Sequence, residues 1–253
     1  MKFILVSIAL LFCFSSRSQV VISGGTLAGA VIGTTNATPP SSGWTLISHT
    51  GVKASGSAST LTTPTFSTVG ANLVVFIVAW SGGSSTVGSD SASDTVNASA
   101  TYTAANPKVQ CFYVISPTQT ASYTVTAAAG GNQIDSIHAY AFNKSSGAPA
   151  FDAEAAGSRN NNWQTATIAG GSVTPATSAD LIFTGVAWDL QSTVTTTATV
   201  DSGFTASPDG NFVNQFGMNS AYKIKSDGTA ENPGWTGTPT ADSDVDTSHW
   251  WFK

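Results

Sequence analysis

Charged residues are scarce in this chain. They make up 9% of its 253 residues, against about 25% in ordinary soluble domains. Nucleic acids and anionic membrane surfaces are held mainly by Lys and Arg, which number nine and form no cluster, so neither partner is expected. Ser, Thr, Gly and Asn are abundant instead, which indicates an extracellular β protein. With 41% apolar and 10% aromatic residues, the chain is not expected to be disordered.

Cysteine is nearly absent too. Cys13 lies in an N-terminal apolar segment that is expected to be removed. Cys111 would then be the one cysteine of the mature chain, so no disulfide framework is expected. Cys111 shares one face of its predicted strand with Tyr113 and Ile115, which favours a buried thiol over a reactive one. After the N-terminal segment, no stretch approaches the roughly 20 apolar residues of a membrane-spanning helix. The sequence therefore predicts no membrane span.

Residues 1–18 have the pattern of a secretory signal peptide. Lys2 provides a positive start, residues 3–14 are apolar, and the small residues of 16–18 predict cleavage before Gln19. Removal of this segment leaves seven basic and fourteen acidic residues, a formal net charge of about −7. We therefore expect a secreted protein, located outside the cell or at a cell surface.

Four sequence blocks occur twice in the same order. Residues 71–80, 111–116, 122–127 and 135–142 are similar to residues 179–188, 220–225, 234–239 and 246–252. The first pair, ANLVVFIVAW and ADLIFTGVAW, is the clearest. This pattern predicts two copies of one unit, at residues 43–143 and 163–253.

Each copy has short runs rich in Val, Ile, Thr and aromatic residues, separated by Gly, Ser, Asn, Asp or Pro. This predicts an all-β fold, an antiparallel β-sandwich of the Ig-like or jelly-roll type built from two internal repeats. Residues 19–42 are predicted to be an extended arm, and residues 144–162 a connecting loop anchored by Phe151. The pattern leaves open whether the repeats form tandem domains or one merged core, and the short connection favours tight docking or merging.

Two strands carry more specific expectations. Residues 73–80 are apolar at every position, so both faces of this strand are expected to be buried. In residues 220–225 Lys223 and Lys225 alternate with apolar residues, which predicts one wet face. The matching positions of the first copy, Phe112 and Val114, are apolar and are therefore interface candidates. Their expected cover is the other repeat, the arm or another molecule, and the alternative is an ordinary buried strand.

Several short elements, at residues 172–175, 179–183, 221–224, 232–236 and 252–253, resemble those of a loose family of secreted bacterial and phage-associated β-sandwich proteins with internal repeats. The resemblance covers most of the mature chain. It implies a secreted β-sandwich and no particular activity, so no functional residue follows from it.

Aromatic residues supply the first candidate site. Trp44, Trp163 and Trp235 lie beside Gly, Ser or Asn near expected strand starts, where exposed rings could stack on sugars. The alternative is core packing, since large aromatic side chains dominate sandwich cores.

Alternating carboxylates supply a second candidate. Asp242, Asp244 and Asp246 precede the last expected strand, and extended backbone could aim their oxygens at one calcium ion. The EF-hand pattern is not met, and a solvated loop is the alternative. No other cofactor is expected.

Each copy also carries an Asp three residues before a His: Asp135 with His138, and Asp246 with His249. Residues three apart on a strand face opposite sides, and no serine or cysteine lies in a nucleophile elbow. A catalytic pair is therefore not expected.

Three functions remain open at this level. The first is a secreted, non-catalytic protein for surface binding or adhesion, with a glycan or cell-surface polymer as partner. The second is a structural subunit of a filament or surface layer, which self-associates when residues 19–36 add a strand to a neighbour's sheet. The third is a glycoside hydrolase with two dispersed carboxylates about 5 to 10 Å apart.

Overall fold

The computed structural model describes residues 43–55, 58–82, 86–100, 106–130, 133–160, 163, 167–175, 180–190, 197–209, 216–237 and 243–253. The predicted signal peptide and arm lie outside these ranges. All described residues belong to one compact unit, Thr38–Lys253. They form strands, turns and bends, and none of them belongs to a helix that could cross a membrane.

The described residues form sixteen strands, in two halves of eight strands each. Half one contains β1 (Trp44–Lys53), β2 (Thr60–Thr62), β3 (Leu73–Ser81), β4 (Val87–Asp90), β5 (Asn97–Ala98), β6 (Lys108–Ile115), β7 (Val125–Ala128) and β8 (Gln133–Lys144). Half two contains β9 (Phe151–Asn160), β10 (Thr167–Ala169), β11 (Asp180–Leu190), β12 (Ala198–Val200), β13 (Thr205–Ala206), β14 (Phe216–Lys225), β15 (Gly234–Gly237) and β16 (Ser243–Phe252).

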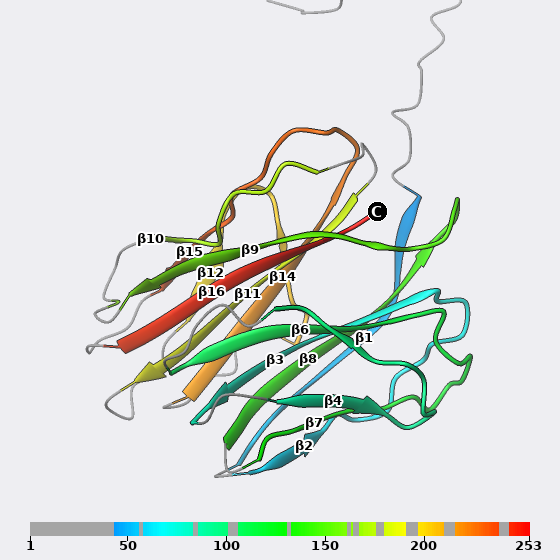
Figure 1. Ribbon diagram of the computed structural model, residues 1–253, viewed down its shortest axis with the longest axis horizontal. Helices are drawn as coiled ribbons and strands as arrows, with labels where there is room; N and C mark the ends of the chain where they lie inside the picture. The colour runs from blue at the N-terminus through cyan, green and yellow to red at the C-terminus, as the bar shows by residue number, and fades with distance from the viewer. Residues whose placement is uncertain are drawn as a thin grey trace, which may run out of the picture. The chain divides into compact units, whose positions relative to one another are not determined.

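Each half is an antiparallel sandwich of one large and one small sheet (Figure 1). The large sheets have the orders β1-β8-β3-β6-β5 and β9-β16-β11-β14-β13, and the small sheets are β2-β7-β4 and β10-β15-β12. Successive strands β1 to β4, and again β6 to β8, alternate between the two sheets of half one, and the corresponding strands of half two do the same. This alternation is the jelly-roll arrangement, so the β-sandwich prediction is confirmed and the jelly-roll alternative fits the strand order.

The two halves agree in register as well as in strand order. Leu73 pairs with Ile115, and in half two Leu181 pairs with Ile224. Cys111 therefore occupies the place of Ser220. This correspondence is what a duplicated unit would produce, and the duplication itself stays a prediction from the sequence.

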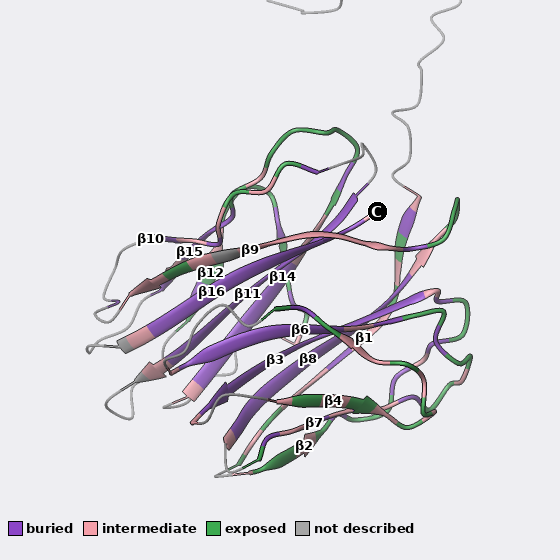
Figure 2. Cartoon of the chain, viewed as in Figure 1, coloured by how far each residue is buried: buried purple, intermediate pink, exposed green. Residues whose placement is uncertain are grey.

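The large sheets pack face to face, and we call their contact the joint. Its core contains Trp44, Leu73, Val75, Ile77, Ala79, Val109, Cys111, Tyr140, Phe142, Leu181, Phe183, Ala187, Met218, Trp250 and Phe252. Every residue of β3 is buried, because one face meets the joint and the other meets the small sheet (Figure 2). The prediction for residues 73–80 is confirmed. The two sandwiches are tightly docked, and the small sheets form the outer layers.

Hydrogen bonds at both sides of the joint link the halves in matching ways. His49 of β1 pairs with Asp209 at 3.0 Å, and Glu154 of β9 accepts a hydrogen bond from the Ala100 amide at 3.1 Å. β1, the first strand of half one, thus contacts the segment after β13 of half two, and β9, the first strand of half two, contacts the segment after β5 of half one.

Phe112 and Val114 do not form an interface with another repeat or molecule. Both are buried in the core between the sheets of half one. Phe112 stacks on Phe76 with ring centroids 5.2 Å apart, and Gly88 of β4 lies so close that a Cβ atom there would meet both rings. The small sheet of their own half covers them, so the interface prediction is wrong and the buried-strand alternative is right.

The predicted loop 144–162 is also wrong, since its second part forms the ten-residue strand β9. Small and charged residues with low β propensity fill this strand, which is why the sequence did not reveal it. β9 pairs with β16 at the edge of the sheet, and Gly157 is needed there because a Cβ atom would collide with Thr247. Phe151 does serve as an anchor, with its ring 5.1 Å from that of Tyr113.

Candidate functional site

Threonine side chains line the outer faces of both small sheets. On half one they are Thr60, Thr62 and Thr126, and on half two Thr167, Thr199 and Thr236. Their strand neighbours, such as Leu61, Ile168 and Trp235, point inward and contact the cores. Since side chains alternate across a strand, the threonines point outward.

The two threonine faces, as we call these sets, are built alike. Thr62 and Thr126 share a hydrogen bond of 2.8 Å between their hydroxyls, and Thr167 and Thr236 share another of 2.8 Å. Neighbouring strands lie about 4.8 Å apart, and alternate residues on one strand about 6.8 Å apart. The described outward residues of these strands carry no charge. Each face is thus a small, flat and neutral array of hydroxyl and methyl groups.

The three tryptophans predicted to be exposed are buried instead. Trp163 and Trp235 lie in the core of half two, and Trp44 lies in the joint. Trp235 alternates with the outward Thr236 and donates a hydrogen bond from Nε1 to Thr184 Oγ1 at 2.9 Å. Rings that fill the space between sheets cannot stack on a sugar, so the exposure prediction is wrong for all three.

Carboxyl groups from three strands converge at one end of the joint, where β3 and β11 end and β6, β8 and β16 begin. Asp135 of β8 is 6% exposed and Asp246 of β16 is 3% exposed. Asp189 of β11 lies directly opposite Asp244 of β16. Asp189 lies two residues from Ala187 of the joint core, and Asp246 and Asp244 lie four and six residues from Trp250, so all three face the joint. Asp135 bonds the Ser81 side chain and lies near Asp189, at the same end of the joint. We call this group of four the acidic end.

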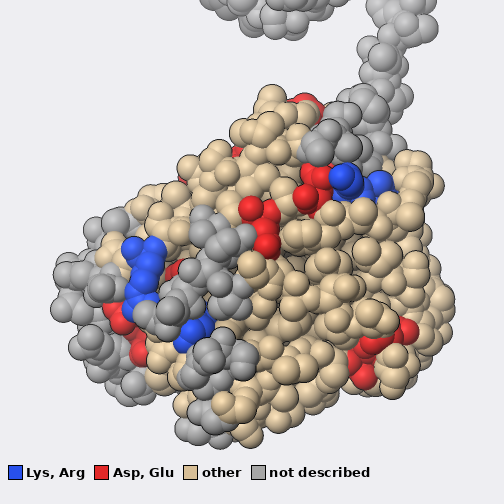
Figure 3. All heavy atoms as spheres, in the orientation of Figure 1, with Lys and Arg blue, Asp and Glu red and all other residues tan. Residues whose placement is uncertain are grey.

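Two cations lie beside the acidic end. Arg159 Nη2 binds Asp244 at 3.3 Å. Lys108 is 2% exposed, and its Nζ donates hydrogen bonds to the Gly82 carbonyl at 2.7 Å and to Asn106 Oδ1 at 2.9 Å. In Figure 3, Lys, Arg, Asp and Glu atoms lie together at the left, over the ends of β6, β9 and β16, while most of the visible surface is uncharged.

Burial dominates the electrostatics of this end. Burial, together with the nearby Asp189 charge, raises the pKa of Asp135 to about 8. Burial raises the pKa of Asp246 to about 7, although an amide hydrogen bond from Val109 and the charge of Arg159 oppose the rise. Burial and Asp244 raise the pKa of Asp189 to about 6. Burial also lowers the pKa of Lys108.

The calcium prediction gains nothing from this geometry. Asp242 lies outside the described residues, Asp244 is bound to Arg159, and Asp246 is buried beside Val109. Among the residues that the structure describes, no group of three His, Cys, Asp or Glu side chains is placed to hold a metal ion. The hydrolase alternative does find converging carboxyl groups, but Asp135 and Asp246 are buried within the joint.

The two Asp-His pairs are not equivalent in the structure. His138 faces the joint, where its Nδ1 lies 2.6 Å from Ser220 Oγ, which also bonds the Tyr140 hydroxyl at 2.7 Å. His249 faces the outer core, with Nδ1 2.9 Å from the Gly170 carbonyl. The strand register aligns His138 with Ser248, so the matching of the two histidines was off by one residue. Burial lowers the pKa of His138 to about 3 and that of His249 to about 4, which leaves both neutral.

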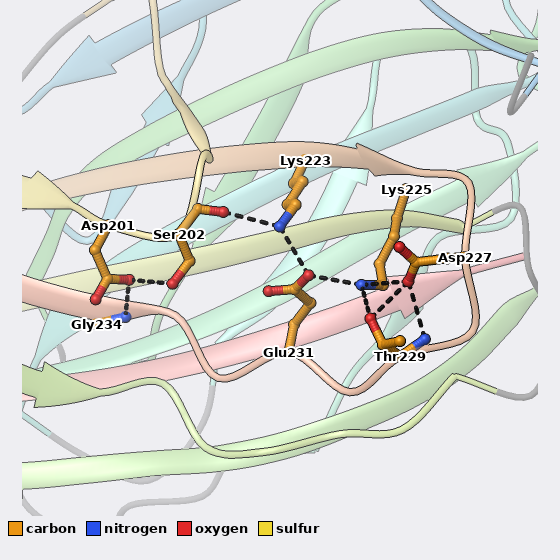
Figure 4. A network of polar contacts seen from close by, with 8 residues as sticks. All are labelled: Asp201, Ser202, Lys223, Lys225, Asp227, Thr229, Glu231 and Gly234. Atoms are coloured by element: carbon orange, nitrogen blue, oxygen red, sulfur yellow. Dashed lines mark hydrogen bonds and ion pairs between the residues drawn. The ribbon is translucent and has the colours of Figure 1, made fainter. Parts of the chain in front are cut away.

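An ion-pair network covers the face of β14 that was predicted to be wet (Figure 4). Glu231 Oε1 lies 2.7 Å from the Nζ atoms of both Lys223 and Lys225. Lys225 is buried and also pairs with Asp227 at 2.8 Å. These hydrogen bonds hold the pKa of Asp227 below its usual range and lower that of Glu231 although burial opposes this. The wet-face prediction is wrong, because the segment that carries Glu231 folds over the lysines.

Sequence reasoning missed the threonine faces, the acidic end and this network. The first had a readable signal, since Thr alternates with apolar residues in TLT (60–62) and TVT (124–126). The others join residues that are far apart in the chain, such as Asp135 and Asp246, and no local pattern indicates such pairs.

Comparison of the chain with protein-family models, with curated proteins and with solved structures finds no match.

Proposed function

We propose that this is a secreted, non-catalytic β-sandwich protein that binds a neutral, hydroxyl-rich polymer at a cell or particle surface. The observation that carries the proposal is the pair of threonine faces. Each presents regularly spaced hydroxyl groups that both donate and accept hydrogen bonds, beside methyl groups that fit the apolar faces of sugar rings.

The rest of the architecture supports this choice of surface. Both faces of each large sheet are covered, one by the joint and the other by a small sheet. A partner can therefore approach the sheets only at their ends, at their edges or on the outer faces of the small sheets. The two threonine faces lie on opposite outer layers, so one molecule can engage two strands of polymer. Weak single contacts gain strength when two sites act together.

The proposal is tested by retention of the mature protein on insoluble neutral polysaccharides, such as cellulose, chitin and starch granules. Combined Thr60→Ala, Thr62→Ala and Thr126→Ala substitutions are expected to weaken retention at least about tenfold, the equivalent of about 1.4 kcal/mol. Thr205→Ala, an exposed threonine on β13, is the matched control. Retention that is unchanged in the triple variant, or absent on every polymer, would overturn the proposal.

A second candidate function is assembly with other copies. It is favoured by β1, a ten-residue edge strand that pairs only with β8 among the described strands and that follows the predicted arm directly. An open edge of this kind accepts an added strand. Light scattering after size exclusion, with and without residues 19–40, tests it. An oligomer that needs these residues supports assembly, and a monomer in both cases contradicts it.

A further inference from the structure

The joint contains more acidic than basic groups at one end. Asp135, Asp189, Asp244 and Asp246 lie there, and the cations beside them are Lys108 and Arg159. Arg159 binds Asp244, while Lys108 Nζ donates hydrogen bonds to the Gly82 carbonyl and to the Asn106 amide oxygen. If all four carboxyl groups were ionised, this buried end would carry net negative charge.

The local hydrogen bonds do not compensate for that charge. The Ser81 side chain bonds Asp135, and the backbone amides of Val109, across the joint, and of Thr247 bond Asp246. Asp135 Oδ1 and Asp246 Oδ2 are buried and have no hydrogen-bond partner among the described residues. An ionised carboxylate in such a place is unfavourable, and a protonated one is not.

We infer that the acidic end is a proton-controlled joint: the carboxyl groups of Asp135, Asp189 and Asp246 hold protons while the two large sheets are packed, and loss of these protons loosens this end of the contact. The closely opposed pair of Asp189 and Asp244 strengthens the effect, since like charges directly opposite on neighbouring strands are destabilising. Tighter packing at acidic pH and weaker packing at alkaline pH follow. The inference does not depend on the proposed function.

Other charged groups on the packed elements do not reverse this balance. Lys53 ends β1 and pairs in register with Ser136, but its side chain is exposed. On β8 and β1, His138 and His49 lie further along the joint, and neutral His138 adds no positive charge. Glu154 of β9 is acidic and would add to the repulsion. Asp242 lies outside the described residues.

The sign of the pH dependence follows from the raised pKa values. A carboxyl group whose pKa is higher in the folded state binds its proton more tightly there, so its contribution to stability is fully present below the unfolded pKa of about 4. It is then lost as pH rises through the folded values of about 6 for Asp189, 7 for Asp246 and 8 for Asp135. Stability is therefore expected to fall between about pH 4 and about pH 9.

The direct test is an NMR titration of the aspartate carboxyl carbons in the mature protein, which needs no substitution. At least one aspartate is expected to titrate above about pH 6, where an ordinary aspartate is fully ionised. Amide hydrogen exchange, corrected for intrinsic pH effects, is expected to rise at least about tenfold at Val109 and Asp246 between about pH 6 and about pH 9. Amides at the opposite end, such as Ile115 and Ile224, should not follow.

Substitution gives a second readout. Asp135→Asn and Asp246→Asn should flatten the pH dependence of the unfolding midpoint. Asp227→Asn, which removes an exposed carboxyl group of half two whose pKa is lowered, should leave that dependence as in the parent between about pH 5 and about pH 9. If every aspartate titrates below about pH 5, or if exchange at Val109 is independent of pH, the inference is wrong even when the Asn variants fail to fold.

Discussion

The same strand position is stabilised in different ways in the two halves. In half one, Val114 of β6 packs into an apolar core beneath the small sheet. In half two, the equivalent Lys223 of β14 forms an ion pair with Glu231. The architecture therefore fixes where a residue lies, but not whether that place is apolar or charged, provided that a charge receives its partner.

The largest loss of stability is expected when a charge is introduced into half one without the partner that it has in half two. Val114→Lys places an ammonium group in the apolar core of half one, where Tyr123 occupies the bridge position that Glu231 has in half two. We expect a loss of more than about 3 kcal/mol of unfolding free energy, measured by urea denaturation.

Lys223→Val is the reciprocal control. Its side chain is partly exposed, and Glu231 keeps Lys225 as a partner, so a loss of about 1 kcal/mol or less is expected. Equal losses in both variants would show that the two positions do not differ as described.

Removal of the shared carboxylate tests half two alone. Glu231→Gln leaves Lys223 and Lys225 without their common partner, and Lys225 is buried, so a loss of about 2 kcal/mol is expected. Asp227→Asn, which removes an exposed partner of Lys225, is the control and should change stability little. If both variants behave alike, Glu231 does not have the central role.

The buried histidines sharpen the comparison through pH. Their folded pKa values, about 3 for His138 and about 4 for His249, lie below the unfolded value of about 6.5. Unfolding therefore takes up protons, so their contribution is present above pH 6.5 and is lost as pH falls toward 4. His249→Gln should reduce the loss between about pH 6.5 and about pH 5 by about 1–2 kcal/mol relative to the parent. If His249→Gln loses as much stability as the parent over this pH range, His249 is not neutral and buried as described.

The smallest effects are expected where the halves are linked at the sides of the joint. Glu154→Gln and Asp209→Asn each remove the charge from one partly exposed contact, and each should cost about 0.5 kcal/mol. When His49 is protonated, its bond to Asp209 is an ion pair, which salt screens. The cost of Asp209→Asn should therefore be smaller in high salt. Losses above about 2 kcal/mol would mean that these links, and not the aromatic core, hold the halves together.

The sequence was sufficient for the strands that follow simple patterns. Residues 73–80 are apolar throughout, and the structure buries both faces of that strand. The first repeated block lies on β3 and β11, which are the central strands of the two large sheets. Within β11, Thr184 and Gly185 interrupt the apolar run for a reason that only the packing shows. Thr184 accepts the Trp235 hydrogen bond, and a Cβ atom on Gly185 would lie 3.0 Å from Val109 and 3.1 Å from Ile77 across the joint.

The predicted sites failed because exposure depends on what covers a strand. Trp235 and Val114 lie on strand faces that a second sheet covers, and no local sequence pattern indicates that sheet. β9 was missed because its role rests on pairing with β16, not on its own propensity. The threonine faces could have been found, since their alternation with apolar residues is local.

The central claim is that the two halves form one body through the aromatic joint. Differential scanning calorimetry of the mature protein tests it most directly, because tightly docked sandwiches should melt together and loosely linked ones should not. The account predicts a single transition whose calorimetric and van't Hoff enthalpies agree. Two separable transitions, one for each half, would contradict it.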